Sequence, residues 1–154
     1  MEKTISRKKR CNIKEGLTNY GFLIIPLVIN QKTCRFIIDS GSHRNALSDA
    51  DLEAMACFKP SGKTVETAGL YGQKCDTPLG LLSYEIGGQC CEDEFFVIPG
   101  KVFASFQEED GIQISGLLGL AFLKKYHCVI DLTEGSVIVN VSEDDKQSED
   151  AKVA

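Results

Sequence analysis

The chain has 154 residues, a length that suits one domain able to bury a core without disulfides or metal. Its 43% hydrophobic and 25% charged residues are ordinary for a soluble globular protein, and its formal net charge of -5 argues against nucleic acid as the main partner. The charge is uneven, because residues 1–14 carry six basic residues against one acidic residue and residues 142–154 carry five acidic residues against two basic ones. We expect residues 1–19 to be a flexible basic arm, residues 20–141 the folded domain and residues 142–154 a disordered acidic tail.

The basic cluster Arg7-Lys8-Lys9-Arg10 has two interpretations. Such clusters occur in nuclear-targeting and nucleic-acid-binding segments, but a short basic arm on an acidic protein is more often a solubilising end. The apolar stretch 22–29 that follows contains Pro26 and is too short to span a membrane. It also lacks a small-x-small cleavage site, so a secretory signal is not indicated. We therefore expect a cytoplasmic protein that binds neither membrane nor nucleic acid.

The seven cysteines are scattered, and they include no Cys-x-x-Cys pair. Their odd number does not fit a disulfide framework. Cys90 and Cys91 are adjacent, so in a strand they would point to opposite faces and at most one would face the core. His43 and His127 have no metal-ligand spacing around them. We expect reduced thiols, no metal site and no cofactor.

Short strands and turns are predicted from residue 20 onwards. Residues 20–30 and 33–39 are rich in β-branched and aromatic residues, and Asn30-Gln31-Lys32 between them predicts a hairpin turn. A helix is predicted over 48–58, with Ser48 and Asp51 as a capping pair. Residues 63–68 and 79–86 predict a long hairpin with a glycine-rich tip.

The second half of the chain continues this pattern. The sequence predicts a turn at Gly87-Gly88, a strand over 94–98, a loop over 101–112, a short helix over 120–126 and a closing hairpin of 128–132 and 136–141. Phe103 and Phe106 are spaced to pack together if the loop contains a helical turn. Many short strands with one or two short helices predict an all-β barrel or sandwich.

A carboxylate follows one of these strands directly. Asp39-Ser40-Gly41 comes after the apolar run Phe36-Ile37-Ile38, where the chain must turn, although this triplet is also ordinary turn chemistry. Later in the chain Gly116-Leu117-Leu118-Gly119 leads into a helix, which is followed by Val129-Ile130-Asp131-Leu132. Together these segments resemble the retropepsin-like aspartic peptidases over about residues 20–141. The resemblance implies an acid protease barrel with one or two short helices.

The resemblance also implies roles for individual residues. Asp39 would be the catalytic acid, supported by its loop neighbours Ser40, Gly41 and Ser42, with Ser40 bonding across a dimer and the Ser42 hydroxyl donating to Asp39. The flap that covers substrate would be formed by Ala68, Gly69, Leu70, Tyr71 and Gly72. Structural positions, where glycine permits close crossing of the chain, would be Gly116, Leu117, Leu118 and Gly119.

Peptide hydrolysis by this chemistry needs two carboxylates. Two such groups about 3 Å apart share one proton and divide the roles of acid and base. The chain has one Asp-Ser-Gly, so the second Asp39 must come from a second copy across a two-fold axis. Asp131 is favoured for a turn or network role, because no Ser-Gly or Thr-Gly follows it. Ser40 and Ser42 lack the Gly-x-Ser-x-Gly context of a serine nucleophile.

The sequence therefore predicts a homodimeric aspartic-type endopeptidase, a hydrolase whose substrate is a peptide or an unfolded protein. The alternative is a catalytically silent dimer of the same fold that binds peptides or acts as an interaction module. An intact Asp39-Ser40-Gly41 favours the enzyme, because a silent relative has no need of the acid.

Overall fold

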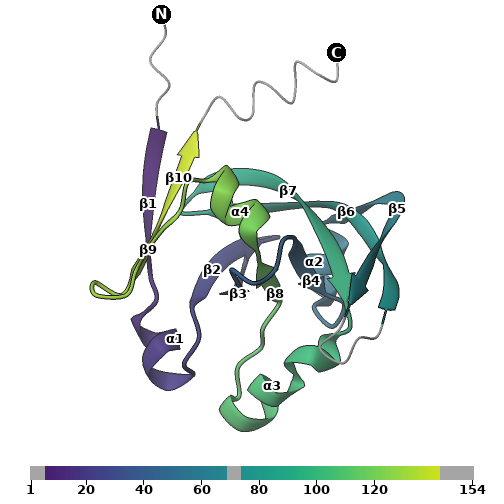
Figure 1. The fold of residues 1–154 in the computed structure, drawn as a ribbon, viewed down its shortest axis with the longest axis horizontal. Coiled ribbons are helices and arrows are strands. Elements are labelled where there is room, and N and C mark those ends of the chain that lie inside the picture. Colours follow the sequence, from purple (N-terminus) through teal and green to yellow (C-terminus); the bar gives the residue numbers. More distant parts are fainter. Residues whose placement is uncertain (1–5, 69–73, 143–154) are drawn as a thin grey trace, which may run out of the picture.

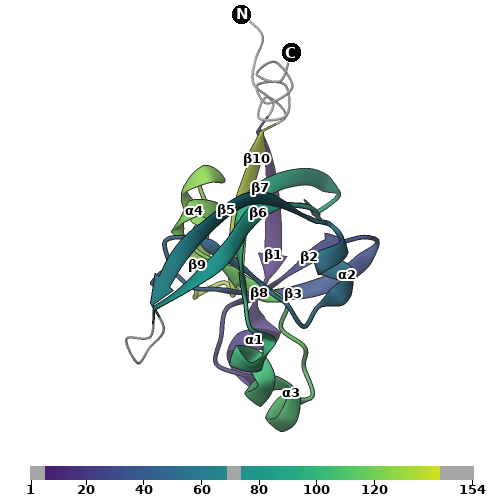
Figure 2. The same cartoon turned by 90° about the vertical axis from the view of Figure 1, so that its right-hand side faces the viewer.

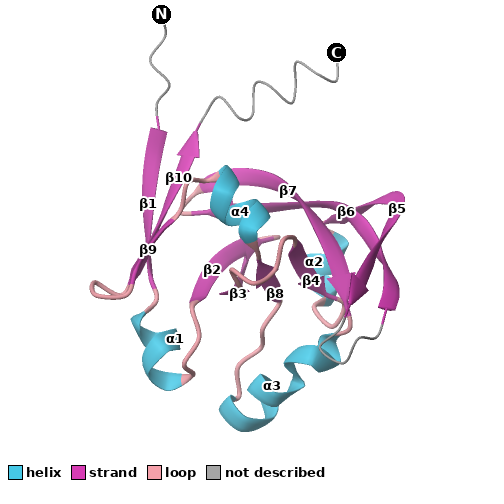
Figure 3. Cartoon of the chain, viewed as in Figure 1, coloured by secondary structure: helices cyan, strands magenta, loops and turns pink. Residues whose placement is uncertain are grey.

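A computed structural model describes residues 6–68 and 74–142 of the chain (Figures 1 and 3). The strands are β1 (Ser6–Asn12), β2 (Ile24–Ile29), β3 (Lys32–Ile38), β4 (Asn45–Ser48), β5 (Phe58–Ala68), β6 (Lys74–Ile86), β7 (Gln89–Ile98), β8 (Gly116–Leu118), β9 (Val129–Asp131) and β10 (Ser136–Ser142). The helices are α1 (Lys14–Asn19), α2 (Leu52–Ala56), α3 (Ala104–Asp110) and α4 (Leu120–Lys125), with a 3-10 turn η1 (Gly100–Phe103).

Most strands belong to one sheet with the order β2-β3-β8-β4-β7-β6-β5. An additional pairing of β2 with β6, at Val28 and Glu85, closes six of these strands into a barrel and leaves β5 beside β6. The predicted β2–β3 hairpin is present, and its turn residues Asn30 and Gln31 both have positive φ, as a tight two-residue hairpin turn requires. The prediction of an all-β barrel is confirmed.

The barrel encloses the main core. Phe36 of β3 and Phe95 of β7 meet edge to face with ring centroids 6.1 Å apart, and Phe122 and Tyr126 extend this core toward β10. A smaller cluster of buried apolar side chains, which includes Ile24 and Phe103, lies toward α1 and α3. No helix in the described parts of the chain is long and apolar enough to cross a membrane.

The N-terminal segment differs from the expected flexible arm. Residues 6–12 form β1, which pairs antiparallel with β10 along its whole length, and α1 follows. Ile13 is buried, and its backbone N–H donates to the carbonyl of Gly135 at 3.0 Å. The four consecutive basic residues predict a solvated arm, so the sequence does not indicate this strand. A strand needs only backbone pairing and one buried face, and β10 supplies the pairing edge.

Two further elements differ from the sequence prediction. The helix α2 begins after Asp51, whose carboxylate caps it by accepting from the N–H of Ala54 at 3.1 Å, whereas Ser48 belongs to β4. The segment expected to be a loop over 101–112 contains η1 and α3. Phe103 is buried and Phe106 packs against the same apolar cluster. The spacing of these two aromatic residues therefore favours a helical turn, although the segment is acidic.

The vicinal cysteines behave as expected from strand geometry. Cys91 of β7 is buried and Cys90 is exposed, because adjacent residues of a strand face opposite sides. Cys91 contributes to the main core.

A buried carboxylate ties α4 to the barrel. Asp93 of β7 accepts hydrogen bonds from the hydroxyls of Tyr84 at 2.5 Å and Tyr126 at 2.6 Å, and from the ammonium of Lys125 at 2.6 Å. Burial, followed by the charge of Asp93, raises the pKa of both tyrosines above the ordinary value of 10.0. Burial also raises the pKa of the Cys34 thiol from 9.0 to about 11.

We expect the protein to lose stability in alkaline solution. The unfolded chain releases the thiol and phenol protons from about pH 9 to 10, while the folded chain retains them, so stability falls as pH rises through this range and is unaffected below it. The measurement is the urea unfolding midpoint at about pH 8 and about pH 10.5. A midpoint that stays constant or rises would contradict this expectation.

Tyr126→Phe is expected to lower the free energy of unfolding by about 1.5–3 kcal/mol at neutral pH, because Asp93 loses a donor while remaining buried. It should also reduce the alkaline loss of stability. Tyr20→Phe is the matched control, since the Tyr20 hydroxyl makes no hydrogen bond within the described residues. Equal stability losses for the two variants would show that the Asp93 network contributes little.

Candidate active site

Asp39 lies directly after β3, in a loop held by backbone hydrogen bonds. Its N–H donates to the carbonyl of Leu118 at 2.9 Å, and its carbonyl accepts from the N–H of Ser42 at 3.1 Å. The N–H of Gly41 donates to Asp39 Oδ1 at 2.9 Å. A Cβ at Gly41 would approach that oxygen to 3.1 Å, so glycine allows the close turn. The half-buried carboxylate is thus oriented by the loop that carries it.

Gly116 of β8 and Gly119, which follows this strand, allow the chain to cross close to this loop. A Cβ at Gly116 would overlap the carbonyl oxygen of Ala46, and a Cβ at Gly119 would overlap the carbonyl oxygens of Arg44 and Ser42. These are backbone atoms, which cannot rotate away as a side chain would. The close crossing expected at both glycines is therefore present, beside the residues that follow Asp39.

The helix α4 is bonded to the same loop. Its first residues, Leu120 and Ala121, donate their N–H groups to the carbonyls of Ser42 at 2.8 Å and His43 at 3.0 Å. The side chain of Asn45 accepts from the N–H of Gly119 at 3.0 Å. The position of the loop is therefore coupled to α4 and β4 as well as to β3.

Ser42 does not have the expected acceptor. Its hydroxyl donates to the carbonyl of Arg44 at 2.8 Å, so its proton is not directed at Asp39. The expected donation from Ser42 to the carboxylate is therefore not observed in the single chain. Ser40 is exposed, and its side chain makes no hydrogen bond within the described part of this single chain.

The predicted flap corresponds to the β5–β6 hairpin, which projects from the barrel (Figure 2). The two strands pair from Phe58 and Leu82 as far as Ala68 and Lys74, with an irregularity between Pro60 and Thr64. Ala68 is the last residue of β5. The other predicted flap residues, Gly69, Leu70, Tyr71 and Gly72, lie outside the described residues.

The sequence does not predict one ion pair beside the loop. Arg44 Nη1 lies 3.0 Å from Glu94 Oε1, and both side chains are about half exposed. The partners are fifty positions apart in sequence, and they meet because β4 and β7 pair in parallel, with Asn45 opposite Phe95. No local pattern in the sequence signals such a contact.

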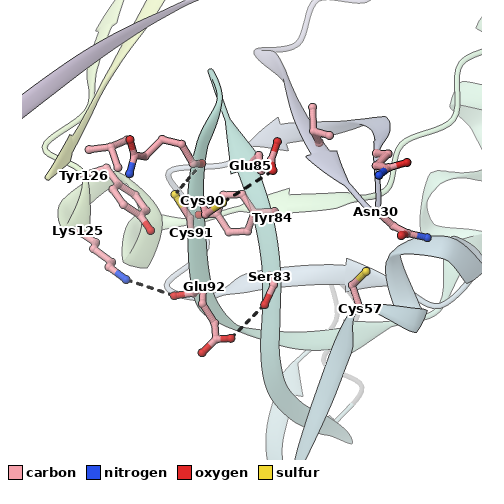
Figure 4. Close-up of a pocket in the computed structure, with 14 residues that line it drawn as sticks. Asn30, Cys57, Ser83, Tyr84, Glu85, Cys90, Cys91, Glu92, Lys125 and Tyr126 are labelled. Carbon is pink, nitrogen blue, oxygen red and sulfur yellow. Dashed lines mark hydrogen bonds between the residues drawn. The ribbon is translucent and has the colours of Figure 1, made fainter. Parts of the chain in front are cut away.

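A cavity of about 420 Å³ lies elsewhere on the barrel, and no residue of the Asp39 loop lines it. Its walls come mainly from β6, β7 and the end of α4, and they include Tyr84, Cys91, Lys125 and Tyr126 (Figure 4). Burial raises the pKa of the Cys91 thiol to about 11, which keeps it protonated and a poor nucleophile at neutral pH. Within residues 6–68 and 74–142, no three His, Cys, Asp or Glu side chains are grouped to hold a metal ion.

A family model described as aspartyl protease matches residues 25–122, which is more than half of the chain. The chain belongs to the aspartyl protease family. The matched range contains the Asp39 loop, the β5–β6 hairpin, Gly116 and Gly119. A search of curated protein sequences finds no match.

Solved structures of aspartyl proteases are similar in fold. A retropepsin-like aspartic protease from Rickettsia conorii matches with a TM-score of 0.58 at 19% identity, covering 92% of this chain and 97% of that one. The retroviral protease-like domain of Ddi1 from Leishmania major matches with a TM-score of 0.52 at 19% identity, covering 79% and 90%. The fold is therefore retropepsin-like, as the motifs predicted.

A single Asp-Ser-Gly distinguishes this aspartyl protease chain from one that carries both acids itself. Asp131 has the turn role that its sequence context favours, because its Oδ1 accepts from the N–H of Glu134 at 3.0 Å in the β9–β10 turn. The chain thus offers one candidate catalytic carboxylate, Asp39.

Proposed function

We propose that the protein is an aspartic endopeptidase that hydrolyses peptide bonds with a dyad formed by Asp39 and the same residue of a second copy. One observation carries the proposal. Asp39 follows β3 of a retropepsin-like barrel, with its Oδ1 held by the N–H of Gly41, in a chain of the aspartyl protease family. Because one chain supplies one such acid, the proposal requires a homodimer.

The reaction uses the shared proton of the dyad. The ionised Asp39 takes a proton from a bound water, whose oxygen attacks the carbonyl carbon of the peptide bond. The protonated Asp39 of the partner donates its proton to the carbonyl oxygen. When the tetrahedral intermediate breaks down, the carboxyl that took the water proton donates it to the nitrogen of the leaving amine. The ionised carboxylate takes a proton from a hydroxyl of the intermediate, so the dyad again holds one proton. No cofactor takes part.

Substrate binding is proposed at the flap. An extended peptide adds as a strand beside the β5–β6 hairpin, and residues 68–72 close over it. Glycines at positions 69 and 72 allow backbone groups to approach the peptide. Ser40, exposed in the single chain, is proposed to bond across the dimer and brace the two loops.

A cytoplasmic location is also proposed. The six cysteines that the structure describes are free thiols, as expected in a reducing compartment.

The direct test is incubation of the purified protein with a denatured protein mixture at several values from about pH 4 to 7, where a shared-proton dyad operates. We expect new peptide termini by mass spectrometry, with none in the Asp39→Asn control. Equal, null digestion by both proteins would reject the peptidase and favour a silent peptide-binding dimer.

A further inference from the structure

Both ends of α4 are tied to consecutive residues of β7. At the start of the helix, the N–H of Gly119 donates to Asn45 Oδ1 at 3.0 Å, and Asn45 Nδ2 donates to the carbonyl of Glu94 at 3.3 Å. Just after its last residue, the hydroxyl of Tyr126 donates to Asp93 Oδ2 at 2.6 Å. The helix is therefore fixed both in direction and in rotation about its axis.

The contacts at Asp93 are more than α4 needs for burial alone. Phe122 of α4 is already fully buried in the main core, which gives the helix an apolar anchor. Asp93 adds a carboxylate that is only 8% exposed. It accepts from Lys125 and Tyr126 at the end of α4 and from Tyr84 of β6. Replacing buried charged groups with well-packed apolar ones is often neutral or stabilising, so this network points to a role in fixing orientation.

The other end of α4 reaches the loop that carries Asp39. The N–H groups of the first two residues of α4 donate to the carbonyls of Ser42 at 2.8 Å and His43 at 3.0 Å. The N–H of Ser42 in turn donates to the carbonyl of Asp39 at 3.1 Å. A helix of six residues is about 9 Å long, so a rotation at one end also moves the other. Asp93 is thus connected to the candidate catalytic residue through one short helix.

We propose that Asp93 is a positioning residue for peptide hydrolysis, which acts through Lys125, Tyr126 and α4 to hold the Asp39 loop and does not touch the substrate. Asp93 has this role only if the proposed function holds, because the role requires Asp39 to take part in hydrolysis. A carboxylate that must face a second one at about 3 Å tolerates little displacement, and a shift of about 1 Å can cost about a hundredfold in rate. Loss of Asp93 is therefore expected to slow the chemical step and to leave substrate binding unchanged.

Two hydroxyl deletions at the same carboxylate oxygen provide a matched pair of variants. Tyr126→Phe removes the donor at the end of α4, whereas Tyr84→Phe removes the donor from β6 and leaves α4 attached. Both should lower the stability of the fold. At a temperature where all variants are folded, Tyr126→Phe is expected to lower kcat by about 3–10-fold with KM unchanged, and Asp93→Asn by about 10–100-fold, whereas Tyr84→Phe should keep the wild-type kcat. Equal kcat losses in the two tyrosine variants would overturn the positioning role.

The pH profile of kcat distinguishes positioning from a simple loss of folded protein. Fewer folded molecules would scale the whole profile down without changing its shape. A displaced Asp39 loop weakens the sharing of one proton between the two carboxylates, so the two apparent pKa values of the profile should approach each other and the bell should narrow. A profile of unchanged width in both Tyr126→Phe and Asp93→Asn would contradict the role assigned to Asp93.

Hydrogen exchange at the start of α4 separates failure of this role from failure of the proposed function. The N–H groups of Leu120 and Ala121 are expected to exchange faster in Tyr126→Phe than in Tyr84→Phe, because their acceptors belong to the Asp39 loop. Equal exchange in the two variants would overturn the link even if the wild type hydrolyses peptides. Faster exchange in Tyr126→Phe, with no hydrolysis by the wild type, would reject the proposed function and support the link between Asp93 and the loop.

Discussion

Asp39→Asn is expected to reduce the rate of peptide hydrolysis by about 10²–10⁴-fold, the range that a general acid–base group contributes. An amide cannot take a proton from water at this position. The variant is nearly isosteric and keeps an oxygen that accepts from the N–H of Gly41, so the fold and its thermal unfolding should be unchanged. The measurement is the initial rate of digestion of a denatured protein, beside circular dichroism.

Asp49→Asn provides the matched control for this variant. Asp49 also follows a barrel strand and also accepts a backbone N–H, from Gly100 at 2.8 Å, but it lies outside the Asp39 loop. It is expected to retain wild-type activity. Equal activity of the Asp39 variant and the wild type would remove Asp39 from the mechanism.

Gly119→Ala is expected to lower the free energy of unfolding by about 1–3 kcal/mol or more, as overpacking of a tight site does. The added Cβ would overlap the carbonyl oxygens of Arg44 and Ser42, so either β8 or the Asp39 loop must move. Since α4 bonds to the same loop, we also expect hydrolysis to fall. Urea unfolding measures the stability change.

Gly41→Ala separates this steric effect from a general cost of replacing glycine. Among the described residues, a Cβ at Gly41 meets only Asp39 Oδ1, at 3.1 Å, so the stability loss is expected to stay below about 1 kcal/mol. A Gly119→Ala protein as stable as the wild type would show that the chain can make room for a Cβ at Gly119 beside the Asp39 loop, and would contradict a tight crossing there.

Local patterns were sufficient to predict most of the barrel and the position of Asp39. Apolar runs bounded by turn residues mark β2 and β3, and a carboxylate directly after such a run stands out. They failed where tertiary contacts decide the structure. The strand β1 is stabilised by pairing with β10, more than a hundred residues away, while its own composition resembles a solvated arm.

The same limit applies around the site. The partner of Glu94 is Arg44, and the donors to Asp93 come from β6 and α4, so these contacts depend on how the strands are ordered. The choice of acceptor by Ser42 depends on the turn geometry after Gly41, which the sequence leaves open. A motif thus locates the acid, whereas the fold determines its neighbours.

The shared dyad is tested most directly by mixing wild-type protein with Asp39→Asn protein at constant total concentration and measuring hydrolysis after subunit exchange. Each mixed dimer has one acid and is expected to be inactive. At equal amounts about a quarter of the dimers carry two acids, so activity should fall to about a quarter of the wild-type value, following the square of the wild-type fraction. A linear decrease to about a half would show that each chain acts with its own acid, and would contradict the paired Asp39 mechanism.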